Sequence, residues 1–157
     1  NMAGWRIGMA AGNPDLLKYL SVYKSQADSS SFKSIMDAGI TALTGDQSWI
    51  KERNQIYCER RDIIYEYLTQ LGMKLNKPHA SLYIWFHIPD SWEDENEFCN
   101  SLLEETGVSL TPGSVYGDQG KGFARISIAT PTNRIIEAMN RLSDWLVRKK
   151  DNASEKS

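Results

Sequence analysis

Residues that bind metals or form disulfide bonds are scarce in this chain. It has two cysteines, Cys58 and Cys99, in helix-like segments without a CxxC spacing, and two histidines, His79 and His87. Neither histidine has a second ligand at a spacing that metal sites use, so we expect no metal. We interpret both cysteines as reduced, buried thiols of a cytosolic protein.

A strong charge of one sign and a long apolar run are also missing. The net charge is −2 and the isoelectric point is near 5.7, which gives no reason to expect nucleic acid or an anionic membrane as a partner. No apolar run approaches the ~18 residues that cross a bilayer, and no signal-peptide pattern opens the chain. We therefore expect a cytoplasmic protein with no nucleic-acid or membrane partner.

What the chain does contain is the composition of a globular protein. Hydrophobic residues make up 41% and charged residues 24% of its 157 residues, and this length allows a buried core. Hydrophobic periodicity and turn residues predict one strand, three helices, and then a strand-helix-strand-strand-helix unit. In chain order we expect a strand at 7–11, helices at about 15–26, 32–44 and 46–71, a strand at 82–88, a helix at 94–106, strands at 108–111 and 123–129, and a helix at 131–148.

This pattern predicts an α/β fold built from several parts. Residues 1–45 are interpreted as the tail end of a larger domain, because one strand cannot form a sheet, and residues 46–72 as a long connecting helix. Residues 73–148 are expected to form a small α/β domain with helices on one face of a small sheet. Residues 149–157 are polar and are expected to be a flexible tail.

The apolar pattern also predicts which surfaces are covered. The stripe from Phe32 to Leu43 is expected to be a helix face that packs in a larger domain and is left exposed, as an apolar patch, in this chain. Leu103 is expected to face inward. The charged residues 59–62 are expected to form a solvated surface. The strand at 82–88 is apolar on both sides, so we expect it to be covered on both sides.

The opening stretch contains the first candidate binding residue. Arg6 lies where a polar loop turns at Gly4 and enters the first apolar strand, with Gly8 close behind. Glycines on either side allow the backbone to come close to a ligand. Taken alone, Arg6 is equally consistent with an ordinary surface arginine before a buried strand.

Three blocks of the sequence resemble, in order and spacing, the class I/II aminotransferases, enzymes of the fold type I pyridoxal-phosphate (PLP) group. The blocks are NMAGWRIGMAAGN at residues 1–13, KPHASLYIW at 77–85 and EETGVSLTPGSVYGDQGKGFARISIA at 104–129. Ala80 stands where the family usually has glycine. The sequence of these blocks is most similar to that of the LL-diaminopimelate aminotransferase-like group. The resemblance therefore implies the C-terminal portion of a fold type I PLP-dependent aminotransferase.

The resemblance assigns roles to two arginines. Arg6 is carried over as a residue that binds the phosphate of PLP, because a guanidinium offers paired donors to phosphate oxygens. Arg125 is carried over as the residue that holds the carboxylate of the substrate in a fixed pose. The alternative for Arg125 is a salt bridge at a sheet edge. Tyr83, Trp85 and Tyr116 could line the substrate pocket, although aromatic residues in strands more often belong to the core.

The resemblance also implies that the catalytic residue is not in this chain. In this family the Schiff-base lysine precedes the motif around Arg6, so it would lie upstream of Asn1. The implied cofactor is PLP, the implied partners are an amino acid and a 2-oxo acid, and the implied assembly is a homodimer. Three alternatives stay open: a PLP-dependent lyase or synthase on the same scaffold, the aminotransferase-like domain of a transcription regulator, and an inert α/β domain.

Overall fold

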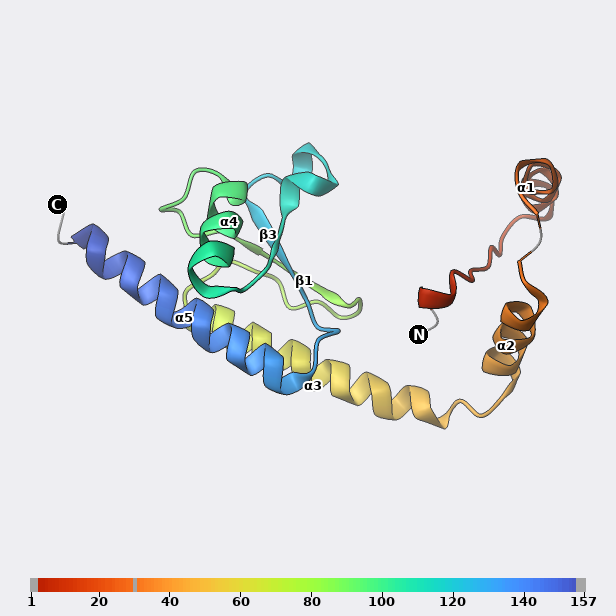
Figure 1. Cartoon of the computed structure of the whole chain (residues 1–157), viewed down its shortest axis with the longest axis horizontal. Coiled ribbons are helices and arrows are strands. Elements are labelled where there is room, and N and C mark those ends of the chain that lie inside the picture. Colours follow the sequence, from red (N-terminus) through yellow and green to blue (C-terminus); the bar gives the residue numbers. More distant parts are fainter. Residues whose placement is uncertain (1–2, 30, 155–157) are drawn as a thin grey trace. The chain divides into compact units, whose positions relative to one another are not determined.

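A computed structural model describes residues 3–29 and 31–154 of the chain. The chain divides into two compact units, residues 1–51 and residues 52–157, and each is described by itself. Within the described residues, none of the helices combines the length and the apolar character that a membrane span requires. The first unit contains η1 (Ala3–Trp5), α1 (Pro14–Ala27), α2 (Lys33–Thr44) and the start of α3 (Ser48–Gln70) (Figure 1).

The second unit is a small three-stranded sheet with helices, as the sequence predicts, and its strands pair antiparallel. The strand order is β1-β3-β2, so β3 is the central strand. The elements after α3 are β1 (Tyr83–His87), α4 (Glu95–Thr106), β2 (Thr111–Pro112), η2 (Gly113–Tyr116), η3 (Asp118–Gly120), β3 (Phe123–Ser127) and α5 (Thr132–Ser154).

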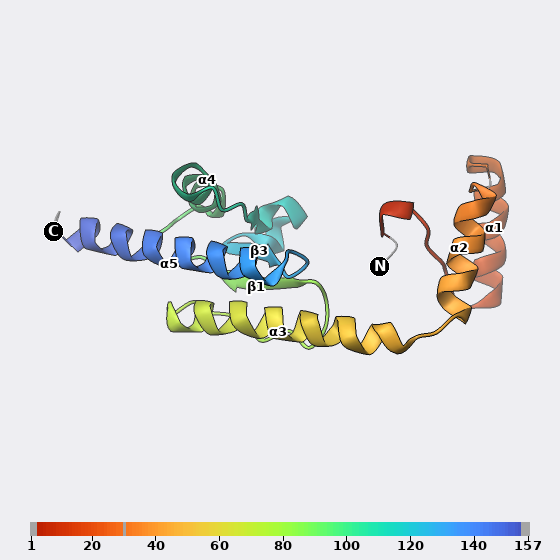
Figure 2. The same cartoon turned by 60° about the horizontal axis from the view of Figure 1, so that its bottom comes forward.

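One face of the sheet builds the core of the second unit together with α3, α4 and α5. Alternate residues of β1 and β3 point to this face and are buried, among them Phe86 and Ile126. On the helix side, Trp145 of α5 is fully buried and its ring meets that of Phe98 at 5.5 Å. The helices α3 and α5 run side by side in both views (Figures 1 and 2).

The opposite face of the sheet is not covered within the second unit. It carries Tyr83, Trp85 and His87 from β1, and all three side chains are half-buried or exposed. The expectation that the strand at 82–88 is covered on both sides is therefore wrong for this unit. Aromatic side chains are as apolar as core residues, but here their rings form the wall of an open surface.

Helix ends follow the sequence signals closely. The helix predicted at 46–71 is continuous, and Asp46 accepts a hydrogen bond from the backbone of Ser48 at 2.9 Å. Gly107 ends α4 in the left-handed conformation, with φ 72, which explains why glycine stands there. The last helix was expected to end at residue 148, but α5 continues to Ser154. Residues 155–157 of the expected tail lie outside the described residues.

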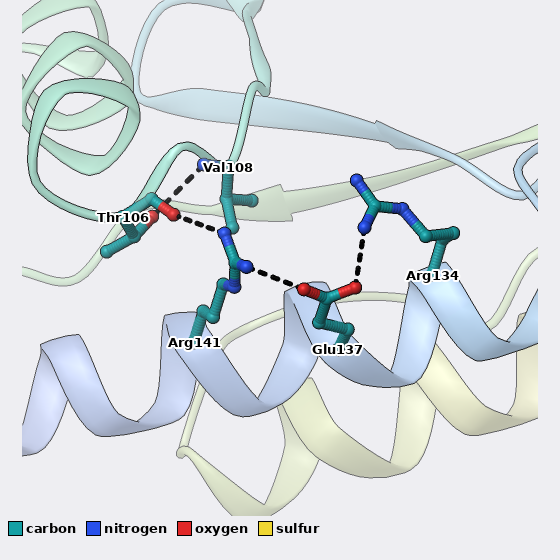
Figure 3. A network of polar contacts seen from close by, with 5 residues as sticks. All are labelled: Thr106, Val108, Arg134, Glu137 and Arg141. Atoms are coloured by element: carbon teal, nitrogen blue, oxygen red, sulfur yellow. Dashed lines mark hydrogen bonds and ion pairs between the residues drawn. The ribbon is translucent and has the colours of Figure 1, made fainter.

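A polar network joins the end of α4 to α5 (Figure 3). Arg141 donates one hydrogen bond to the backbone carbonyl of Thr106 at 2.9 Å and another to Glu137 at 2.6 Å. Arg134 donates to the second carboxylate oxygen of Glu137 at 2.7 Å. A cation at the carbonyl end of a helix is favourable, so Arg141 stabilises the turn that leads from α4 toward β2.

In the first unit, the expected strand does not form, whereas the expected exposure of the apolar helix face is confirmed. Residues 7–11 form no strand, because the described residues offer no neighbouring strand for pairing. The stripe from Phe32 to Leu43 is exposed, and Phe32 retains 71% of its accessible surface. Gly39 is the buried residue of α2 among the described residues.

Three further expectations need correction in the second unit. Cys99 is buried, which raises the pKa of its thiol to about 11, but Cys58 is exposed on α3. Leu103 retains 45% of its accessible surface and does not face inward. The strand expected at 108–111 shrinks to the two residues of β2, because only these pair with β3.

The charged residues 59–62 of α3 are not simply a solvated surface. Arg60 donates to the hydroxyl of Thr132 at 3.1 Å and to the carbonyl of Ala129 at 3.3 Å, which links α3 to the connection between β3 and α5. Asp62 forms an ion pair with Lys77 at 2.9 Å. These side chains therefore tie the helix to two segments that are distant in the sequence.

Candidate functional site

Arg125 occupies the centre of the open sheet face. It lies on β3 opposite Trp85 of β1 and opposite Thr111 of β2. The alternation of the strand sends its buried neighbours, Ala124 and Ile126, to the core face and Arg125 to the other. The sheet thus fixes the backbone position of Arg125 and the face to which its side chain points.

Aromatic rings, rather than acidic groups, surround the guanidinium of Arg125. Its Cζ atom lies 3.9 Å from the ring centre of Tyr83 and 4.6 Å from that of Tyr116. Its Nε atom is buried and has no hydrogen-bond partner among the described residues. No ion pair in the described part of the chain includes Arg125, and β3 is a central strand, so the salt-bridge alternative at a sheet edge does not hold.

A buried donor without a partner is uncommon in a folded protein. Nearly all such groups are satisfied by another protein group, by water or by a ligand, because an unsatisfied group loses the hydrogen bonds that water would give it. Arg125 keeps its positive charge at any physiological pH and presents paired donors in one plane. The charge and the donors of Arg125 are therefore not used by an acidic group of the described residues.

Tyr116 is brought to Arg125 by two short turns in close contact. A Cβ atom at Gly113 would lie 2.9 Å from the carbonyl oxygen of Phe123 and would also overlap the carbonyl of Gly120. A Cβ atom at Gly120 would in turn overlap the carbonyl of Gly113. Only glycine at both positions allows η2 and η3 to approach this closely.

A buried carboxylate fixes the same turns to α4. Glu95 retains 5% of its accessible surface, and its Oε2 atom accepts a hydrogen bond from the backbone N–H of Gly122 at 2.9 Å. This bond, and after it one from the hydroxyl of Ser114, hold the pKa of Glu95 below its usual range. Nothing in the sequence distinguished Glu95 from the exposed acidic residues next to it, so this contact was not predicted.

We expect Glu95→Gln to lower the free energy of unfolding of the chain by about 1 kcal/mol at neutral pH, because a neutral amide is the weaker acceptor. A carboxyl whose pKa is lower in the folded state stabilises the fold above its unfolded pKa. That stabilisation is lost as the pH falls through the folded pKa. The difference between wild type and Glu95→Gln should therefore shrink as the pH falls below the ordinary pKa of a glutamate and through the lower pKa of the folded state. Urea unfolding at several pH values measures it.

The control is Glu97→Gln, an exposed acidic residue in the same first turn of α4. Because both residues lie at the helix N-terminus, the control removes a similar interaction with the helix dipole. An equal, pH-independent loss for both variants would contradict the role of Glu95.

The aromatic surface continues along the sheet from Arg125. Trp85 meets Tyr116 edge-on at 5.4 Å and Phe123 at 6.3 Å, and Phe123 meets His87 at 3.9 Å. A groove of about 570 Å³ opens beside these rings. Its lining consists of Lys74, Leu75, Asn76, Pro78, Tyr83, Trp85, His87 and Phe123. Tyr83, Trp85 and Tyr116, for which a place in the core was the more common alternative, therefore lie on the same open face as Arg125.

Arg6, the other predicted site residue, lies in the first unit and is exposed. Its backbone has φ 55, a conformation that residues other than glycine rarely adopt. A Cβ atom at Gly4 or Gly8 would meet nothing within 4 Å. Among the described residues, no group of three histidine, cysteine or acidic side chains could hold a metal ion.

Known proteins resemble this chain over nearly its whole length. An LL-diaminopimelate aminotransferase from Desulforudis audaxviator is 43% identical over 148 residues, which are 94% of this chain and 38% of that protein. The enzyme of that name from Moorella thermoacetica is 42% identical over 142 residues, 90% of this chain and 36% of that protein. The chain therefore spans little more than a third of the length of these curated relatives.

Solved structures agree with these relatives. An aspartate aminotransferase from Thermotoga maritima has a TM-score of 0.81 at 32% identity, over 92% of this chain and 36% of that one. An aminotransferase from Staphylococcus aureus has a TM-score of 0.86 at 27% identity, over 93% of this chain and 39% of that one. The family model described as aminotransferase class I and II matches residues 1–142. With the fold, the relatives and this match in agreement, the chain belongs to the class I and II aminotransferase family.

Proposed function

We propose that this chain is the C-terminal portion of a PLP-dependent aminotransferase, which moves an amino group from an amino acid to a 2-oxo acid. The observation that carries the proposal is Arg125, whose charged side chain lies on the open sheet face without an acidic partner among the described residues. An amino-acid substrate always brings a carboxylate, and this arginine fits it.

In the proposed enzyme, Arg125 binds and orients the substrate. A bidentate pair between its in-plane donors and the two carboxylate oxygens fixes the direction of the substrate. This orientation matters because the bond that breaks at the substrate Cα must be held in one geometry for reaction. The aromatic face around Arg125 reduces access of water to the ion pair, which strengthens it.

The residues present fit the proposed cofactor. PLP, when bound, supplies an electron-withdrawing ring that stabilises negative charge at the substrate Cα. Arg6 is exposed, has open space beside the glycines that flank it, and carries no hydrogen bond or ion pair with another described residue. A guanidinium so placed suits a phosphate dianion. We assign Arg6 to the phosphate and place the cofactor lysine upstream of Asn1.

The rest of the proposal concerns the complete protein. We infer that residues 1–45 belong to its large PLP-binding domain, residues 46–72 to the connecting helix and residues 73–148 to its small domain. We further infer a cytoplasmic homodimer, a compartment that suits two free cysteines. The names of these curated relatives make LL-diaminopimelate the first amino acid to test.

The test compares the 157-residue chain with the complete protein, which includes the large PLP-binding domain and its lysine. We expect the complete protein to bind PLP stoichiometrically, with a visible absorbance band, and to transaminate. The 157-residue chain should show neither, because Lys18, Lys33 and Lys121 are exposed and offer only weak, nonspecific attachment.

Product analysis separates the alternatives. An aminotransferase transfers the amino group to a 2-oxo acid, whereas a lyase eliminates part of the substrate, and a sensor or an inert domain forms no product. If the 157-residue chain binds PLP stoichiometrically and turns over substrate, the inference that the Schiff-base lysine lies upstream of Asn1 is wrong.

A further inference from the structure

We propose that Tyr83 and Tyr116 are positioning residues that hold Arg125 ready for a carboxylate through their rings, not through their hydroxyl groups. This inference rests on the proposed role of Arg125. It adds the pair of side chains that fix the guanidinium when no acidic group of the described chain does so.

The two rings reach Arg125 from different parts of the second unit. Tyr83 begins β1 and its ring centre lies 3.9 Å from the Cζ atom of Arg125, whereas Tyr116 ends η2 and its ring centre lies 4.6 Å away. Trp85, directly opposite Arg125 in the sheet, meets Tyr116 edge-on at 5.4 Å. The position of Tyr116 is thus set by a neighbour as well as by its own turn.

An aromatic contact differs from a salt bridge because it leaves the N–H donors of the guanidinium free. A ring attracts the guanidinium by its electron-rich face and uses none of the N–H donors. A carboxylate of the protein in the same place would occupy two donors and would compete with the substrate. The rings therefore hold the charged group in place and keep its donors available for an incoming carboxylate.

The hydroxyl groups play no part in this arrangement. No hydrogen bond from the hydroxyl of Tyr83 or of Tyr116 is found within the described residues. Both residues are also partly open to solvent, with 37% and 51% of their accessible surface exposed. Replacement of either ring therefore leaves the core intact, and the variants should fold.

The experiment uses the complete enzyme and compares leucine with phenylalanine at both positions. For Tyr83→Leu and Tyr116→Leu we expect kcat/KM for the amino acid to fall about 5- to 30-fold each, mainly through a higher KM. Tyr83→Phe and Tyr116→Phe keep the ring and should stay within about twofold of wild type. Val115→Ala, at an exposed neighbour of Tyr116, is the matched control.

Two further measurements separate positioning from a merely structural role. The first is equilibrium binding of an unreactive analogue of the amino acid without its amino group, compared with the amide of that analogue. The leucine variants should weaken binding of the carboxylate and leave binding of the amide unchanged. The second combines each leucine variant with Arg125→Leu, where we expect no additional loss, because residues that act through one another are not additive.

The outcomes distinguish this inference from the proposed function. Equal weakening of carboxylate and amide, phenylalanine variants as impaired as leucine variants, or additive losses in the Arg125→Leu background would overturn the positioning role. If the wild-type enzyme does not prefer the carboxylate to the amide, the role of Arg125 itself fails. If only Arg125→Leu abolishes that preference, the proposed function stands and the tyrosine pair is refuted.

Discussion

Arg125→Leu in the complete enzyme is expected to weaken productive amino-acid binding by about 1.5–3 kcal/mol, with more lost if the substrate orientation slips. This corresponds to a drop of roughly 10- to 150-fold in kcat/KM. Cofactor loading should remain nearly intact, because Arg125 is assigned to the substrate and not to PLP. Steady-state kinetics and the absorbance of bound PLP measure the two effects separately.

The leucine variant tests charge and donors together, so a second variant separates them. Arg125→Lys keeps the positive charge but loses the planar pair of donors, and we expect an intermediate loss. The control is Arg134→Leu, which removes an exposed arginine of α5 that bonds to Glu137. Unchanged kinetics for Arg125→Leu would show that the substrate carboxylate is bound elsewhere.

Gly120→Ala is expected to cause the largest loss of stability among the substitutions considered. The added Cβ atom would overlap the backbone carbonyl of Gly113, and backbone cannot move aside as a flexible side chain can. Overpacking of a well-packed site costs about 1–3 kcal/mol, and a clash with backbone belongs at the upper end or beyond. Thermal or urea unfolding of the chain measures the loss.

The same substitution should also impair the site. Separation of η2 from η3 moves Tyr116, and with it one of the two rings that contact Arg125. The control is Gln119→Ala, next to it in η3 and exposed, for which we expect a change within about 0.5 kcal/mol. A stable, fully active Gly120→Ala enzyme would mean that the two turns do not need this close approach.

Much of the second unit could be predicted because its signals are local. The stops at Gly72 and Gly107 and the alternation around Arg125 each depend on a few adjacent residues. The structure confirms the long helix, the three-stranded sheet and the placement of Arg125 on the face opposite the core.

The remaining features depend on contacts that no local pattern encodes. Residues 7–11 have the composition of a strand, but a strand exists only where another backbone pairs with it. The contacts of Tyr83 and Tyr116 with Arg125 join the three elements β1, η2 and β3, and the Glu95 bond joins α4 to the turn before β3. The family resemblance implies the role of Arg125, whereas the rings around it are visible only in the structure.

The alternation on β3 has a consequence for how the length of this chain can vary. Ala124 and Ile126 are buried in the core, and Arg125 between them lies on the open face. Insertion or deletion of one residue within the strand would exchange the two faces, burying a guanidinium and exposing an isoleucine. A shift of frame inside 123–127 would therefore destroy core and site together.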